Sequence, residues 1–146
     1  MYEVIVVGTD GSARADVAVR QAIALAKLSR AALHVVHVLR GIALRGEHVD
    51  PAPIAAANRA MRDEGERICA DVASEAKREG VTTQSHIVDG DPADVLLRVS
   101  ESVCADLLVI GNRGMSGIKR LVLGSVPNKV SHHCPCSLLI VDTDAA

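Results

Sequence analysis

The sequence predicts a single α/β domain, with a doubly wound parallel sheet of five strands and about four helices around it. Short runs rich in valine, isoleucine and leucine alternate with stretches of helical period, and this alternation favours parallel pairing. The strand-like runs are apolar almost throughout, which is typical of strands covered on both faces. The length of 146 residues suits one domain, spanning 1–146.

The first half of the chain contains two expected strands and two expected helices. The strands are Glu3–Gly8 and Ala32–Leu39, and Ser12 is the expected N-cap of the helix between them. Residues 40–57 contain glycine and proline without a clear period and are expected to form a loop. A second helix then runs to a stop at Gly80. The apolar positions that mark the helices are Ala15, Val19, Ala22, Ile23 and Ala26, and then Met61, Gly65, Ile68, Val72 and Ala76.

The second half repeats the alternation. The expected strands are Thr82–Val88, Asp106–Ile110 and Ser137–Val141. Asp91 and Pro92 are a typical helix start, because Asp91 can accept from unpaired amides and Pro92 has no N–H to lose. The apolar positions of that helix are Val95, Leu96, Val99 and Val103, and a short last helix is expected over Val126–His133.

Composition excludes several classes of function. The chain is 49% hydrophobic but has one tyrosine, no phenylalanine and no tryptophan, so aliphatic residues must build the core. Proteins that bind single-stranded nucleic acid stack bases on aromatic rings, which are missing here. The net charge of −2 also disfavours binding to a phosphate backbone. No apolar run reaches the length of a membrane span, and the N-terminus lacks a basic signal-peptide region. We therefore expect a cytoplasmic protein without nucleic-acid or membrane partners.

The four cysteines do not suggest a disulfide framework. Cys69 and Cys104 lie in periodic apolar stretches and are expected to be small core residues. The segment His132-His133-Cys134-Pro135-Cys136 matches no common zinc spacing and is expected to be a turn that enters the last strand. Pro135 should limit how the two neighbouring thiols converge, and a disulfide between them is disfavoured sterically.

Ligands of doubly wound sheets bind outside the carboxyl ends of the strands. The residues at two such ends are Thr9-Asp10-Gly11, after the first strand, and Gly111-Asn112-Arg113-Gly114, after the fourth. Four of the eleven glycines fall between the fourth and fifth strands. Gly124 and Ser125 stand immediately before the last helix, where free amides and the helix dipole favour an anion. Since Pro127 has no N–H, the donors should be the amides of Ser125 and Val126.

Charge supports an anion at this position. Between Asp106 and Asp142 there is no acidic residue, whereas the rest of the chain has 12 basic and 18 acidic residues. The basic residues of the acid-free segment are Arg113, Lys119, Arg120 and Lys129. A positive region in a negative protein suits a small anionic ligand.

The pattern Gly-x2-Gly-x9-Gly-Ser resembles the ATP-binding signature of the universal stress protein family, and it is filled by Gly111, Gly114, Gly124 and Ser125. The opening VGTDGS and the ending CSLLIV are similar to the first and last strands of that family. The resemblance covers essentially the whole chain, with residues 40–57 the least diagnostic part. It implies strand order 3-2-1-4-5, a bound adenine nucleotide and a homodimer through the last strand, Ser137–Val141.

The resemblance also implies the binding residues. Asp10 would contact the ribose or adenine, Val38 would meet the adenine edge through its backbone, and Ile110 would pack on the base. With almost no aromatic residues, a base must lie between aliphatic side chains. The full expected set is Gly8, Thr9, Asp10, Val38, Ile110, Gly111, Arg113, Gly114, Gly124, Ser125 and Val126.

Some roles have a second interpretation. Asp10 could cap the first helix, Arg113 could be solvated rather than bound to phosphate, and His37 could approach the ligand or be structural.

Three functional hypotheses follow. The first is an ATP-binding stress-response module, with Mg²⁺ held through the phosphates. The second is a receptor or buffer for cAMP, or a protein that holds AMP, and the third is a dimeric scaffold with a vestigial site. No Walker A motif, G-x-G-x-x-G turn or G-x-S-x-G elbow is present. Because no general base other than Asp10 is positioned, at most slow ATP hydrolysis is expected and no catalytic residue or metal ligand is assigned.

Overall fold

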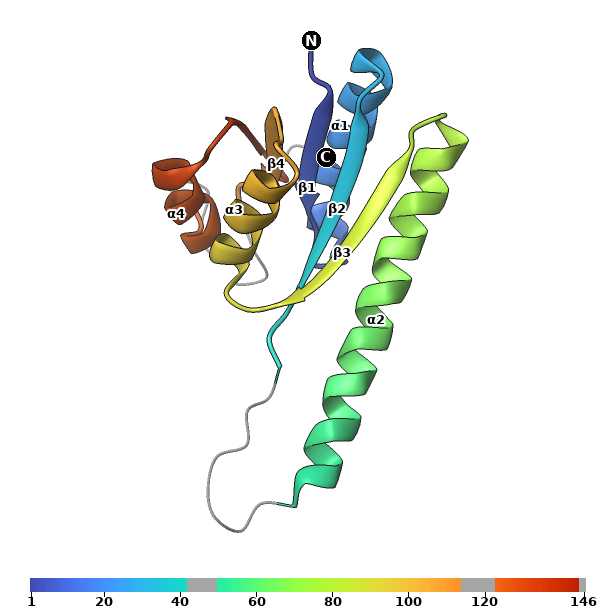
Figure 1. The fold of residues 1–146 in the computed structure, drawn as a ribbon, viewed down its shortest axis with the longest axis vertical. Helices are drawn as coiled ribbons and strands as arrows, with labels where there is room; N and C mark the ends of the chain where they lie inside the picture. The colour runs from blue at the N-terminus through green and yellow to red at the C-terminus, as the bar shows by residue number, and fades with distance from the viewer. Residues whose placement is uncertain (42–49, 114–122, 145–146) are drawn as a thin grey trace.

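The computed structural model describes residues 1–41, 50–113 and 123–144 of the chain. Those residues form one five-stranded sheet with the strand order β3-β2-β1-β4-β5, and all four strand pairs are parallel. The predicted fold class and strand order are confirmed (Figure 1). The elements are β1 (Val4–Gly8), α1 (Ala13–Ser29), β2 (Ala32–Leu39), α2 (Pro51–Arg78), β3 (Thr83–Asp89), α3 (Pro92–Ser102), β4 (Leu107–Gly111), α4 (Ser125–His133) and β5 (Ser137–Val141).

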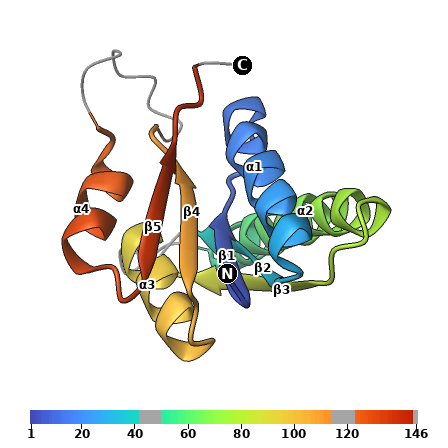
Figure 2. The same cartoon turned by 90° about the horizontal axis from the view of Figure 1, so that it is seen from above.

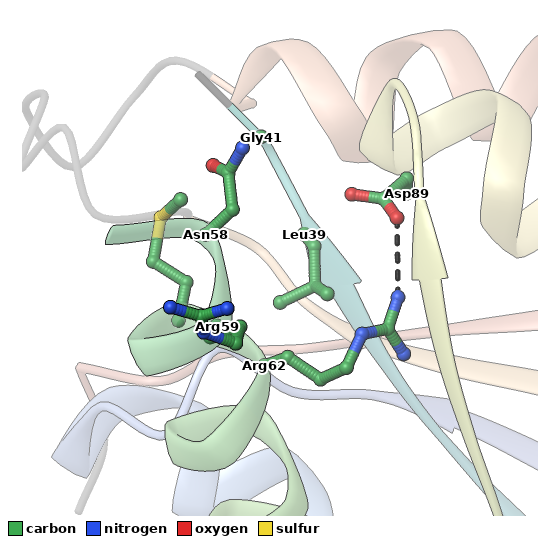
Figure 3. A pocket seen from close by; sticks show the side chains of 7 residues that line it. Leu39, Gly41, Asn58, Arg59, Arg62 and Asp89 are labelled. Atoms are coloured by element: carbon green, nitrogen blue, oxygen red, sulfur yellow. Dashed lines mark hydrogen bonds and ion pairs between the residues drawn. The ribbon is translucent and has the colours of Figure 1, made fainter. Parts of the chain in front are cut away.

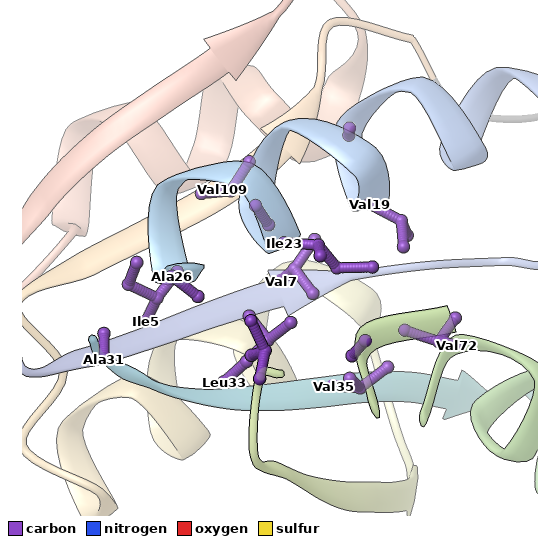
Figure 4. Packing of buried hydrophobic residues seen from close by; sticks show 14 of the residues in the cluster. Ile5, Val7, Val19, Ile23, Ala26, Ala31, Leu33, Val35, Val72 and Val109 are labelled. Atoms are coloured by element: carbon purple, nitrogen blue, oxygen red, sulfur yellow. The ribbon is translucent and has the colours of Figure 1, made fainter. Parts of the chain in front are cut away.

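The helices cover both faces of the sheet, α1 and α2 on one side and α3 and α4 on the other (Figure 2). The alternation of side chains along each strand divides the core accordingly. In β1, Ile5 and Val7 join the α1/α2 side, Val6 joins the α3/α4 side, and all three side chains are 0% exposed. Figure 4 shows the first cluster, where short aliphatic side chains of α1 fill the space above β1 and β2.

Two helix starts follow the predicted chemistry. Ser12 is the N-cap of α1, and its side-chain oxygen accepts from the Ala15 amide at 3.1 Å. Asp91 is the N-cap of α3 and accepts from the Asp94 amide at 3.2 Å, with Pro92 as the first helical residue. Each cap satisfies an amide that has no partner within the helix.

The prediction of a loop over 40–57 is wrong for the second part of that range, because α2 begins at Pro51. Asp50 is the N-cap and accepts from the Ala52 amide at 3.0 Å. Prolines in the first turn lose no helical hydrogen bond, so Pro51 and Pro53 are compatible with a helix start. Residues 42–49 of the expected loop lie outside the described residues.

Among the residues that the structure describes, no helix combines the length and the apolar character needed to cross a bilayer.

Two histidines meet across β2 and β3. Nδ1 of His34 lies 2.8 Å from Nε2 of His86, with one ring donating to the other. The ring centroids are 5.1 Å apart and the ring planes differ by 26°, so the two rings are stacked. Burial lowers the pKa of both rings, and the neighbouring His86 lowers the pKa of His34 further. The contact requires that at least one ring be neutral, and burial favours the neutral form of both.

The aliphatic core can be tested at Leu33, which is 0% exposed on β2. We expect Leu33→Ala to lower the free energy of unfolding by about 2–5 kcal/mol, because it removes buried methyl groups and leaves a cavity. Leu28→Ala is the control, since Leu28 is 72% exposed on α1 and its truncation should change stability by less than about 0.5 kcal/mol. Urea denaturation measures both, and equal losses would contradict the assigned core.

The histidine pair predicts a pH dependence of stability. Both folded-state pKa values are lowered, so the unfolded chain binds more protons, and stability should be lost as the pH falls from about 7 to about 5. His86→Gln should reduce this loss, as measured by urea denaturation at a series of pH values. His132→Gln, at the exposed end of α4, should leave the loss in place. A pH dependence that is identical in wild type and His86→Gln would refute this assignment.

Candidate functional site

The candidate site lies where the adjacent strands β1 and β4 end. Their parallel register pairs Val7 with Val109, so the residues after Gly8 and Gly111 emerge at the same edge of the sheet. The start of α4 is held at this edge by a hydrogen bond from the Gly124 amide to the Asn112 carbonyl, at 3.1 Å. Segments that are distant in sequence are thus brought together as the motif spacing predicted.

The turn between β1 and α1 is fixed by its own polar groups. The Thr9 amide donates to the Val36 carbonyl at 3.0 Å, and the Thr9 hydroxyl accepts from the Gly11 amide at 3.1 Å. Asp10 accepts from the Ser12 amide at 2.9 Å. Ser12, and not Asp10, caps α1, so the interpretation of Asp10 as the cap is wrong. Asp10 is half-buried, and its carboxylate accepts this hydrogen bond from within the turn.

His37 supports this turn from the α1/α2 side of the sheet. Its Nδ1 donates to the Thr9 carbonyl at 3.0 Å. The ring lies against α2 at Gly65, where an added Cβ would be 2.7 Å from Cδ2 of His37. These contacts favour the structural interpretation of His37, because the donor nitrogen is occupied and the ring edge is covered.

The first turn of α4 offers unpaired donors. Gly124 is the N-cap and supplies no side-chain hydrogen bond, and its carbonyl accepts from the Asn128 amide at 3.0 Å. Pro127 has no N–H and is buried. Within the described residues, the amides of Ser125 and Val126 have no acceptor. The Gly124 amide is already used by Asn112, which leaves those two amides at the positive end of the helix dipole.

The side chains expected to hold the base share one face of the sheet. Val38 and Ile110 both pack on the α3/α4 side. Ile110 is only 4% exposed, so it presents little surface to a ligand, whereas Val38 is half-buried. Gly8 lies between their strands, and an added Cβ there would be 2.9 Å from Leu96 of α3. Gly8 therefore allows α3 to approach β1 closely.

The segment after β5 folds back over the end of β4, a feature that the sequence analysis missed. The side-chain oxygen of Asn112 accepts from the Thr143 amide at 3.1 Å and from its hydroxyl at 2.9 Å, and Thr143 is 5% exposed. Glycine at position 111 makes room for the Thr143 side chain, since an added Cβ would lie 2.9 Å from Cγ2 of Thr143. The polar residues that directly follow the last strand were the sequence signal that could have predicted this contact.

Arg113 is neither solvated nor open to a ligand. Its Nη2 lies 3.1 Å from Oδ2 of Asp144, and the Arg113 side chain is only 9% exposed. The same nitrogen makes no well-directed hydrogen bond within the described residues, so the contact is an ion pair. The expectation of a solvated Arg113 is wrong because Asp144, at the end of the chain segment that crosses β4, covers the guanidinium.

Part of the expected site lies outside the described residues, namely Gly114 of the motif together with Gly117, Lys119 and Arg120 of the basic segment. Among the described residues, those that meet at the common edge of β1, β4 and α4 are Gly8, Thr9, Asp10, Gly111, Arg113, Gly124, Ser125 and Val126. Val38 lies one residue before the end of β2.

A separate cavity of about 220 Å³ lies between α2 and the ends of β2 and β3 (Figure 3). It is lined by Leu39, Gly41, Asn58, Arg59, Met61, Arg62 and Asp89. Arg62 and Asp89 form an exposed ion pair across its side at 3.2 Å. None of the predicted binding residues that the structure describes lines this cavity.

Comparisons with known proteins agree on one family. The profile of the Universal stress protein family matches residues 1–142. The universal stress protein YxiE of Bacillus subtilis is 32% identical over 151 aligned positions, covering 97% of this chain and 99% of its own length.

Two solved structures are similar across the chain. A universal stress protein in complex with cAMP is 36% identical, with a TM-score of 0.70 and coverage of 97% of this chain and 98% of its own. A universal stress protein from Archaeoglobus fulgidus in complex with dAMP is 25% identical, with a TM-score of 0.67 and coverage of 97% and 98%.

The packing of α2 against the turn after β1 can be tested by substituting two glycines. Gly11 and Gly80 have φ angles of +79° and +77°, so alanine at either position should cost about 1–2 kcal/mol of backbone strain. At Gly11 the new Cβ would also lie 2.5 Å from Cδ1 of Ile68, whereas at Gly80 nothing is within 4 Å. We expect Gly11→Ala to lose more unfolding free energy than Gly80→Ala in urea denaturation. Equal losses would show that α2 does not pack on this turn.

Proposed function

The chain belongs to the universal stress protein family, and from that premise we propose that it binds an adenine nucleotide where β1, β4 and α4 meet. The observation that carries the proposal is the pair of unpaired amides, on Ser125 and Val126, at the start of α4. A helix start with free amides stabilises a phosphate through hydrogen bonds and through the helix dipole.

The charge distribution supports an anion at this helix start. No acidic residue occurs between Asp106 and Asp142, so no carboxylate of α4 or of the segment before it repels a phosphate. Two carboxylates that follow β5 are engaged. Asp144 is paired with Arg113, and Asp142 accepts from the Asp144 amide at 3.0 Å. A phosphate would therefore meet mainly donors.

The sugar and base would extend from α4 toward the ends of β1 and β2. Asp10 is positioned after β1, where a carboxylate can accept hydrogen bonds from ribose hydroxyls. The half-buried Val38 would lie against the base, with its backbone toward the adenine edge. Because Ile110 is only 4% exposed, we assign its side chain to the surface beneath the base and not to a position beside it.

ATP is the first candidate ligand, because the glycine and serine spacing resembles an ATP-binding signature. Cyclic AMP is the second, and the number of donors supports it. The Gly124 amide is bonded to Asn112, Pro127 has none, and Arg113 is paired, so the described part of the site offers few donors to three phosphates. The similar structure with bound cAMP points the same way.

We expect the nucleotide to be held rather than turned over quickly. The Asp10 carboxylate is engaged with the Ser12 amide inside the turn, which is a poor arrangement for activating a water molecule. Mg²⁺ would be bound through the phosphates of ATP. A reducing compartment such as the cytoplasm suits the free state of the four cysteines.

We also propose that β5 forms a homodimer. Within the described residues β5 has one strand neighbour, β4, and its other edge is unpaired. The side chains of Leu138–Val141 are only half-buried in one chain. An open, apolar edge strand invites pairing with a second copy.

The binding prediction concerns ATP affinity. Calorimetric titration should show saturable binding of ATP to the wild type, and ligand at 100 times Kd should stabilise the fold by about 2.7 kcal/mol. Ser125→Ala removes a hydroxyl at the start of α4. We expect it to weaken ATP binding by roughly threefold to tenfold, the effect of losing one hydrogen bond.

Ser131→Ala is the matched control, because Ser131 is on the same helix and its hydroxyl donates to the Asn128 carbonyl at 2.7 Å. It should leave the affinity unchanged. Competition with cAMP decides between the two candidate ligands, with the tighter nucleotide displacing the other. The absence of both saturable heat and a thermal shift at millimolar ATP and cAMP would reject nucleotide binding.

The dimer prediction concerns molecular mass in solution. Sedimentation equilibrium should give about twice the chain mass of 15.3 kDa at micromolar concentration, because pairing would cover the open edge of β5. A single-chain mass over the whole concentration range would contradict the proposed dimer. That result would leave nucleotide binding by one chain unaffected.

A further inference from the structure

Two thiols meet at the turn between α4 and β5. Cys134 is the C-cap of α4, Cys136 precedes β5 by one residue, and their sulfur atoms are 3.8 Å apart. The expectation that Pro135 limits their convergence is therefore wrong. Cys134 has φ −62° and ψ 126°, and the chain bends at Pro135 and Cys136 before β5 begins. Both cysteines are free and half-buried.

The sulfur separation matches a metal chelate better than a disulfide. A disulfide needs sulfurs about 2.05 Å apart. Two thiolates on one zinc ion, each about 2.3 Å from the metal, are about 3.8 Å apart when the S–Zn–S angle is about 110°. This is the tetrahedral angle, so little movement of either side chain would be required. A linear two-sulfur geometry would need a wider separation.

We propose that Cys134 and Cys136 form a two-thiolate site for a thiophilic metal ion of the zinc class. Within the described ranges, the structure has no cluster of three or more metal-ligating side chains. The remaining positions of the tetrahedron are therefore left to solvent, and the site is open and exchangeable. It is distinct from the nucleotide site, because α4 separates them along its length.

The charges around the thiols favour a cation. Burial, together with the neighbouring Cys134 and Asp106, raises the pKa of Cys136 to about 12. Asp106 is fixed in place, since its Oδ2 accepts from the amides of Glu3 at 2.7 Å and Val4 at 2.8 Å. A thiol held protonated is a poor target for oxidants. Binding of a divalent ion to both thiolates offsets the free-energy cost of deprotonating the two thiols, and the two protons pass to solvent.

The test is a titration of the reduced full chain with Cd²⁺ under anaerobic conditions. Thiolate-to-metal charge transfer gives an ultraviolet band, which is easy to observe because the chain has no tryptophan or phenylalanine and one tyrosine. We expect the band to saturate at one ion per chain and Zn²⁺ to compete for the site. Cys134→Ser and Cys136→Ser should each lose the band. Cys104 is exposed, so the expectation that it lies in the core is wrong, and Cys104→Ser should retain the band.

Alkylation of the wild type provides a measurement that needs no variant. Zn²⁺ should protect Cys134 and Cys136 from iodoacetamide while leaving Cys104 reactive, as read by mass spectrometry of peptides. The proposal is overturned by the absence of a charge-transfer band or by a band that survives in Cys134→Ser. Equal alkylation of Cys134 and Cys136 with and without Zn²⁺ would also overturn it. Because nucleotide titration is a separate measurement, failure here leaves the proposed function standing.

Discussion

Burial of the three central strands, mainly by aliphatic side chains, is the constraint on which the rest of this structure depends. Ile5, Val6 and Val7 of β1 are fully covered from both sides, and β2 and β4 flank them with more valine, isoleucine and leucine. Without large aromatic rings, the helices must approach the sheet closely, and small residues allow this approach. Alanine fills the contact face of α1, and Gly8 admits Leu96 of α3. Most of the polar chemistry is thereby left to the ends of the strands, and the His34–His86 pair on β2 and β3 is an exception.

Most of the fold could be predicted because its signals are local. Apolar runs identified the strands, helical spacing identified α1 and α3, and Ser12 and Asp91 identified where these helices begin. The start of α2 was missed for a physical reason. Proline breaks a helix interior but is tolerated in the first turn, so the same residue signals a loop or a helix start depending on the cap before it. The strand order came from a family resemblance, since local pattern leaves several orders open.

The candidate site was predictable only in part. Glycine spacing predicted a ligand site after β4. The structure holds the start of α4 there through the hydrogen bond from the Gly124 amide to the Asn112 carbonyl, and the binding role of these residues stays a prediction. The contacts made by Thr143 and Asp144 with Asn112 and Arg113 were not predicted, since each joins residues about thirty positions apart and no sequence period reports them. The convergence of the Cys134 and Cys136 sulfurs was also missed, because it depends on how the chain turns between α4 and β5 and not on the spacing of the two cysteines.

Under the proposed function, the Asp144 carboxylate competes with the nucleotide phosphate for the Arg113 guanidinium. An incoming phosphate can use the Arg113 guanidinium only after the Asp144 carboxylate has left it, and the carboxylate is tethered a few residues beyond β5. Ligand binding and release of the C-terminal segment from Arg113 would then be coupled. A strong anion would free the tail, whereas a ligand that makes no use of Arg113 would leave the tail docked. The C-terminal segment would in this way report which kind of molecule occupies the site.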